Sequence, residues 1–120
     1  MNLKENYEKL ANTIIIQAVK DYRAARRYLE KHPHTKELDE TVAEQDRRWR
    51  EQEEKQRKRQ GGRKAKEPPE RKPTREGKQL SRIIDAEKVL SEVERFFHSE
   101  WFGQLTSLDG ETLLRKLREE

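Results

Sequence analysis

The chain has 120 residues, enough for one domain, and its 28 Lys or Arg against 24 Asp or Glu give a formal net charge of +4. Only 30% of the residues are hydrophobic and 43% are charged, so any core must be small. The chain has no Cys, which excludes disulfides and thiolate metal sites. Its longest aliphatic run, residues 14–16, is far shorter than the ~20 residues of a membrane span. The N-terminus also lacks the apolar stretch of a signal peptide, so we expect a soluble, cytoplasmic protein with no membrane partner.

The first predicted element is a long helix over Leu3–Leu29. Apolar side chains recur there at steps of three and four residues, which is the spacing of one helix face. Further apolar residues in its middle widen that face and indicate cover from more than one side: Ile15, Ile16 and Val19. The residue before Pro33 is disfavoured in a helix, so this helix should end near His32.

A second helix is predicted from Lys36 to about Arg59, with Thr35 as its N-cap. The segment is rich in strong helix formers and in opposite charges four residues apart, namely Glu51–Lys55 and Glu54–Lys58. It has no continuous apolar stripe. It is therefore either a solvent-exposed single helix or only partly helical.

Residues 43–79 form a charged insert between two apolar-rich blocks. The insert has three apolar side chains, Ala43, Trp49 and Ala65, and fourteen Lys or Arg against eight Asp or Glu. A segment that buries so little apolar surface cannot by itself offset the entropy of ordering it. Gly61 and Gly62 should end the second helix, and the Pro-rich, charged stretch up to residue 77 predicts a flexible linker.

A third helix is predicted over Leu80–Phe102. Its apolar residues cover more than half of the circumference, which is typical of a helix packed between other helices or against a second subunit. Gly103 should end it. Asp109 can then cap a short last helix over Gly110–Arg118.

These elements predict an all-α fold. A long N-terminal helix and a C-terminal helix pair make a small bundle in a single domain, 1–120, with the charged insert or linker, 43–79, within it. A core of this size gives only a few kcal/mol. A homodimer, or docking on a larger partner, would be an ordinary way to add stability.

Two blocks of the sequence carry a resemblance. They are QAVKDYRAA, from Gln17, and RFFHSEWFGQLTSLDG, from Arg95. Together they resemble small proteins of unassigned function from bacteriophages and conjugative elements of Gram-positive bacteria. The resemblance implies a helical fold and a mobile-element protein that acts in a bacterial host cell, among accessory proteins that include anti-CRISPR and other anti-defence inhibitors. It brings no catalytic residue with it.

The densest basic cluster is the candidate binding site. Seven of the twelve residues from 55 to 66 are basic and none is acidic: Lys55, Arg57, Lys58, Arg59, Arg63, Lys64 and Lys66. We call these seven residues the basic arm. Cations at this density neutralise several phosphates and release counterions, which favours salt-sensitive binding of DNA or RNA. The alternative is a solvated arm that has no partner.

Aromatic side chains are the second kind of candidate. Trp49 stands alone among charges and is either a partner-binding or base-stacking residue, or it packs back onto the helices. The C-terminal aromatic group either forms core or contributes Phe97, Trp101 and Phe102 to an interface. A core this small should leave part of that group exposed.

No arrangement of residues indicates catalysis. The sequence has no nucleophile elbow, phosphate-binding Gly-rich loop or metalloprotease motif. His32, His34 and His98 lack the third and fourth ligands that a metal site needs. We therefore expect a protein that is not an enzyme and binds no cofactor or metal.

Two functional hypotheses remain open. In the first, the chain is a phage or mobile-element accessory protein whose basic arm binds nucleic acid or a nucleoprotein complex, in the sharpest version a CRISPR effector that it inhibits. In the second, it is a protein–protein adaptor for replication or packaging that binds through Trp49 and the aromatic cluster. The charge of the arm favours the first hypothesis.

Overall fold

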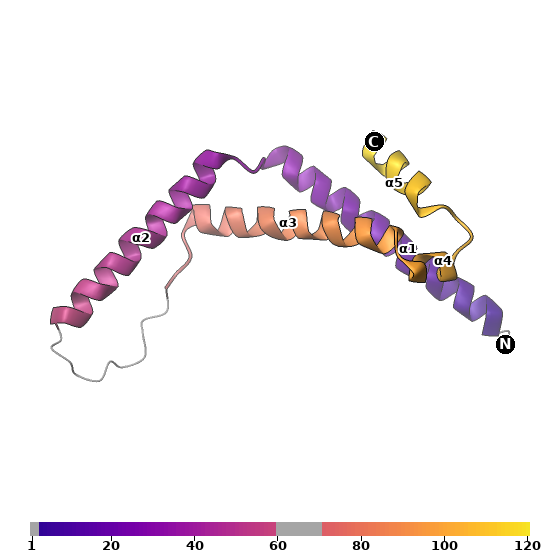
Figure 1. Cartoon of the computed structure of the whole chain (residues 1–120), viewed down its shortest axis with the longest axis horizontal. Coiled ribbons are helices and arrows are strands. Elements are labelled where there is room, and N and C mark those ends of the chain that lie inside the picture. The colour runs from indigo at the N-terminus through magenta and orange to yellow at the C-terminus, as the bar shows by residue number, and fades with distance from the viewer. Residues whose placement is uncertain (1–2, 60–70) are drawn as a thin grey trace. The chain divides into compact units, whose positions relative to one another are not determined.

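The computed structural model describes residues 3–59 and 71–120, and all regular structure in these ranges is helical. Within these ranges five helices follow one another (Figure 1). They are α1 (Leu3–Lys31), α2 (Lys36–Arg59), α3 (Arg75–Phe97), α4 (Glu100–Leu105) and α5 (Gly110–Glu119). The all-α prediction is confirmed. No helix within these ranges is long and apolar enough to cross a membrane.

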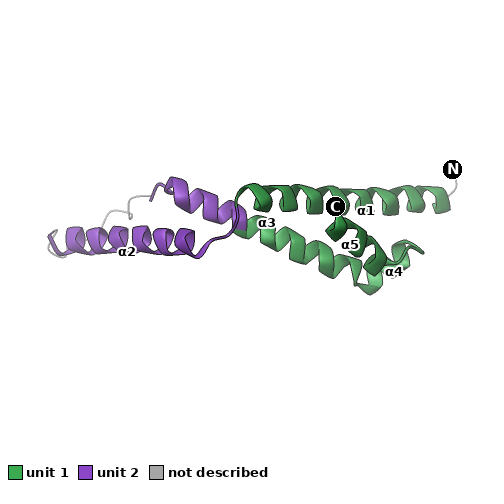
Figure 2. Ribbon diagram, turned by 90° about the horizontal axis from the view of Figure 1, so that it is seen from above, with its two compact units in different colours: residues 1–32, 84–120 green, residues 33–83 purple. Residues whose placement is uncertain are grey.

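The contacts divide the chain into two compact units (Figure 2). Unit 1 combines residues 1–32 with 84–120, and unit 2 comprises residues 33–83. Unit 2 is therefore longer than the predicted insert, 43–79. It includes the whole of α2, which begins at Lys36 directly after the Pro33 turn, and the first turns of α3, which begins at Arg75.

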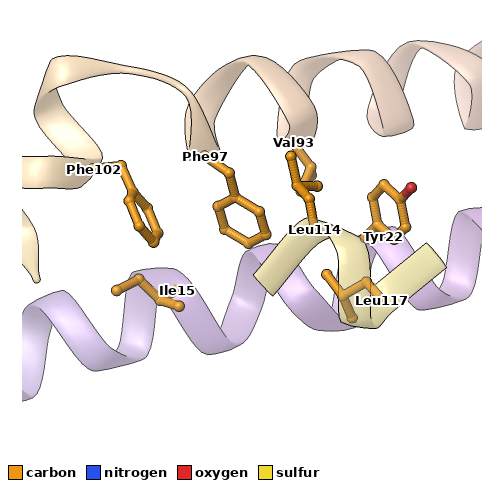
Figure 3. Close-up of a cluster of buried hydrophobic side chains, with 7 residues drawn as sticks. All are labelled: Ile15, Tyr22, Val93, Phe97, Phe102, Leu114 and Leu117. Atoms are coloured by element: carbon orange, nitrogen blue, oxygen red, sulfur yellow. The ribbon is translucent and has the colours of Figure 1, made fainter. Parts of the chain in front are cut away.

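The core of unit 1 forms where α1, α3, α4 and α5 meet. Its buried members are drawn in Figure 3: Ile15, Tyr22, Val93, Phe97, Phe102, Leu114 and Leu117. The Phe97 and Phe102 rings lie 5.1 Å apart between centroids, in the edge-to-face arrangement that aromatic pairs prefer. Because every described buried side chain is apolar, this core depends on packing and water exclusion rather than on buried polar contacts.

Helix α1 is only partly covered. Its buried residues, Ala11, Ile15, Tyr22 and Ala25, recur at steps of three, four and seven and make one face. Every side chain from Leu3 to Leu10 is exposed. The N-terminal turns of α1 extend past the end of α3 in both views (Figures 1 and 2).

The predicted third helix is corrected at both ends. The structure begins α3 five residues earlier, at Arg75, and ends it at Phe97 rather than Phe102. Ser99 causes the break, because its hydroxyl donates to the Phe96 carbonyl (2.6 Å) and accepts from the Phe102 N–H (3.2 Å). One side chain thus closes α3 and N-caps α4.

Gly103 does not end a helix, contrary to the sequence prediction. It lies inside α4, which ends at Leu105. The prediction for the last helix is confirmed. Asp109 is its N-cap and accepts from the Glu111 N–H, and the Thr112 hydroxyl also donates to the Asp109 carboxylate (2.7 Å).

Polar contacts at the surface fasten α5 to α1 and α3. Arg23 donates two hydrogen bonds to the Glu120 carboxylate, at 2.8 and 2.6 Å. These hydrogen bonds, more than Coulomb attraction, lower the pKa of Glu120. Arg118 of α5 also pairs with Glu94 of α3 (3.2 Å). The hydroxyl of Tyr22, on α1, lies 3.4 Å from the same carboxylate oxygen of Glu94.

The first residue of α5, Gly110, is buried at the end of α3. A Cβ at this position would overlap the carbonyl oxygen of Phe97 and lie 3.1 Å from the Phe102 ring. Backbone atoms cannot move aside as a flexible side chain can. The close approach of α5 to α3 therefore requires Gly110.

We predict that Gly110→Ala destabilises the protein by about 2 kcal/mol or more, because overpacking of a filled core typically costs ~1–3 kcal/mol. Urea unfolding followed by circular dichroism measures the loss. Gly103→Ala is the matched control, since a Cβ there meets nothing within 4 Å. It should be neutral or stabilise by up to ~1 kcal/mol through helix propensity. Equal effects of the two substitutions would contradict this account.

Candidate nucleic-acid interface

Unit 2 is built from α2, residues 71–74 and the beginning of α3. The cap predicted for α2 is confirmed, because the Leu38 N–H donates to the Thr35 hydroxyl (3.2 Å). None of the residues of α2 is buried. The helix thus depends on its capping, its strong helix formers and its charge pairs.

The basic arm is described only in its first part. Lys55, Arg57, Lys58 and Arg59 form the exposed C-terminal end of α2. Arg63, Lys64 and Lys66 lie outside the described residues, as do residues 61–70 of the predicted linker. The end of that linker is corrected, because Arg75 to Gly77 belong to α3. The structure therefore locates four of the seven predicted binding residues.

Two of these four cations have carboxylate partners on the previous helical turn. Arg57 pairs with Glu53 at 3.0 Å and Lys58 with Glu54 at 3.7 Å. The predicted Glu51–Lys55 pair does not form. Among the described residues, Lys55 and Arg59 have no carboxylate partner, and they lie one turn apart on one helix face with Lys58 beside them.

The N-terminal half of α2 is net acidic, because residues 36–47 hold two Lys or Arg against five Asp or Glu. Glu44 accepts hydrogen bonds from Arg47 (2.6 Å) and Arg48 (3.2 Å). The Arg47 hydrogen bond is the main reason that the pKa of Glu44 lies below its ordinary value. Positive charge without a partner is therefore concentrated at the C-terminal end of the helix.

The ring of Trp49 is partly covered by the side chain of Arg71. It is half-buried, and the Arg71 guanidinium lies 5.4 Å from its ring centroid, which is a cation–π distance. Arg71 also forms an ion pair with Asp46, one turn before Trp49. Arg71 lies in the non-helical segment before α3, so these contacts cover the ring in part and do not place Trp49 in the core cluster.

A second set of contacts joins α2 to the beginning of α3. The Thr74 hydroxyl donates to the Gln45 side-chain oxygen (2.6 Å), and the Gln45 amide donates to Glu76 (3.1 Å). The Gln45 hydrogen bond is the main cause of the lowered pKa of Glu76. Thr74 also accepts from the Gly77 N–H and so caps α3.

The predicted aromatic interface is corrected for two of its three residues. Phe97 and Phe102 are 3% and 2% exposed, so both belong to the core of unit 1. Trp101 is 51% exposed and remains accessible to a partner. The reason is the break at Ser99, which turns Phe102 inward and leaves Trp101 outside.

The histidines are not assembled into a metal site. His34 pairs with Asp39 at 2.8 Å, and the His32 ring stacks on Tyr28 at 4.6 Å. Within residues 3–59 and 71–120 no group of three His, Asp or Glu side chains is arranged to hold a metal ion.

Sequence reasoning missed the residues that hold unit 2 together. Asp46, Arg71, Gln45 and Thr74 each look like ordinary surface residues in the sequence, and their contacts join positions about thirty residues apart. Helical spacing identifies neighbours one turn apart only. No local signal therefore pointed to these four residues.

Comparisons with protein-family models, with curated proteins and with solved structures found no match to this chain.

We predict that Asp46→Ala increases quenching of Trp49 fluorescence by acrylamide, because Arg71 loses the carboxylate that holds it over the ring. The measurement uses a Trp101→Phe background and selective excitation of tryptophan, so that the signal comes from Trp49. Glu54→Ala is the control, since it removes an acid from the same helix without a contact to Arg71. Unchanged quenching in the Asp46 variant would show that Arg71 does not shield Trp49.

Proposed function

We propose that this protein binds nucleic acid without sequence preference through the basic arm, beginning at the C-terminal end of α2. One observation carries the proposal. Lys55 and Arg59 are exposed on one face of the helix with no carboxylate partner among the described residues. The three further cations at 63, 64 and 66 follow in the sequence.

The ion pairs on α2 do not cancel this charge. Exposed pairs contribute about 0–1 kcal/mol each, because water and salt screen them. A phosphate backbone with high charge density can displace Glu53 and Glu54 from Arg57 and Lys58. These carboxylates then weaken binding without preventing it.

The same cations also have a purely structural explanation. Lys and Arg in the last turn stabilise a helix, because they face the negative end of its dipole. That explanation accounts for Arg57, Lys58 and Arg59. It does not account for the run of basic residues that continues to residue 66.

The more specific version of the proposal is a mobile-element inhibitor that places the basic arm on the guide or target phosphates of an RNA-guided nuclease. It is supported by the charge of the arm and by the resemblance of the two sequence blocks. The adaptor alternative is supported by the half-exposed ring of Trp101.

We predict that replacing Lys55, Arg57, Lys58 and Arg59 with Gln lowers the affinity for a duplex oligonucleotide. Each lost phosphate contact should reduce the slope of log K against log salt by about 0.9, so the slope should fall by roughly two to four. Fluorescence anisotropy in rising salt measures both quantities.

Two further variants sharpen this test. Replacing Glu53 and Glu54 with Gln should strengthen binding, because it releases Arg57 and Lys58. Neutralising four cations away from the arm, namely Arg82, Lys88, Arg115 and Lys116, gives the same net charge and should have the smaller effect. Equal losses in the two four-residue variants would show that only net charge matters, and no binding at low salt would refute the proposal.

A further inference from the structure

Unit 1 has an apolar surface that its own helices do not cover. Leu3, Tyr7 and Leu10 are 86%, 50% and 59% exposed on the projecting end of α1. Their spacing of four and three residues continues to Ile14 and forms one stripe along the helix. We call Leu3, Tyr7, Leu10 and Ile14 the α1 stripe.

The stripe runs into a groove of 440 Å³ between α1 and the C-terminal part of α3. The groove is lined mainly by apolar side chains, among them Ile14, Ala18, Val93, Phe96 and Trp101. On α1 it extends from Thr13 to Asp21, which is about 12 Å at 1.5 Å per residue. The projecting part of the stripe, from Leu3 to Leu10, is about 10 Å long by the same measure.

We propose that the occupant of this groove is the α1 stripe of a second copy of this chain, with the two α1 helices antiparallel. Each copy has a protruding apolar helix end and, next to it, a groove of matching length. A twofold axis then lets each end fill the other groove, so both apolar surfaces are covered at once. A twofold pairing of this kind closes and builds no filament.

The polar groups fit this direction. Helices α1 and α3 run antiparallel in unit 1 (Figure 2). Of the residues that line the groove, Asp21 on α1 and Glu92 on α3 therefore lie at the end far from Trp101. In an antiparallel pair the N-terminal end of the second α1, with its positive partial charge, reaches these acids. The second copy's Tyr7 then lies opposite Gln17, whose amide nitrogen already donates to Asp21 (2.9 Å) and whose side-chain oxygen can accept from the Tyr7 hydroxyl.

The size of the surface sets the expected affinity. Leu3, Tyr7, Leu10 and Trp101 can each bury about 100 Å², which gives roughly 800 Å² of apolar area in a twofold pair. With polar flanks added, the pair approaches the lower limit of ~1,200 Å² for specific interfaces. We therefore expect a dimer that dissociates at micromolar concentrations.

Sedimentation of the full chain from about 1 to 300 µM tests the dimer, because this range brackets a micromolar dissociation constant. The average mass should rise from that of one chain towards that of two. Leu10→Glu should raise the dissociation constant at least tenfold, since it places a charge in the groove. Leu10 makes no part of the core, so circular dichroism should show an unchanged fold.

Ile16→Glu is the matched control. Ile16 is also an exposed apolar residue, 54% accessible, but it lies about 160° around α1 from Ile14. The same charge there should change the dissociation constant less than twofold. A monomer at every concentration, a dimer that survives Leu10→Glu, or an equal loss with Ile16→Glu would each overturn the proposal.

Cysteine pairs test the direction, because the chain has no Cys of its own. In the antiparallel pair, Leu10 of one copy lies opposite Ile14 of the other. A mixture of the Leu10→Cys and Ile14→Cys variants should therefore form more disulfide-linked dimer than either variant alone. If each variant links best to itself, the helices are parallel and the proposed groove filling is wrong. The dimer does not depend on the basic arm, so the two proposals fail independently.

Discussion

The packing of Phe97 and Phe102 against α1 is the interaction on which unit 1 depends. Both rings are almost fully buried, and they meet only because the chain breaks at Ser99 and returns through α4. The return brings Gly110 against the Phe97 carbonyl, closer than any other residue type allows. Helix α5 can then add Leu114 and Leu117 to the same core.

The surface chemistry follows from how little apolar material the chain has. With 30% hydrophobic residues, unit 1 fills one small core and leaves the first turns of α1 uncovered. Helix α2 of unit 2 has few apolar side chains and none that is buried. Polar contacts join it to the segment before α3 and to the first turn of α3: the Arg71 contacts with Asp46 and Trp49, and the Gln45 amide between Thr74 and Glu76. Such exposed contacts are individually weak. A contact with nucleic acid or with a second copy would add to the stability of the folded chain.

The two surfaces proposed here differ in the force that would drive binding. The end of α2 offers positive charge, which attracts phosphate over a distance that salt shortens. The α1 stripe offers apolar area, which salt affects little. The two proposed activities would therefore be separated by their different dependence on salt. They also lie in different units, so a substitution in one need not disturb the other.

The sequence by itself determined the class of the fold, the limits of α1 and α2, and the caps at Thr35 and Asp109. These features depend on neighbours within one or two helical turns, so periodicity and capping residues are sufficient to predict them. Only the tertiary structure decided where α3 ends, which aromatic rings are buried, and that Trp49 lies under Arg71. An apolar residue has the same sequence pattern whether it belongs to a core or to an interface. The sequence around a surface Arg does not identify an acidic partner about 25 residues away. Such contacts are set by how helices pack, because packing joins positions that are distant in the chain.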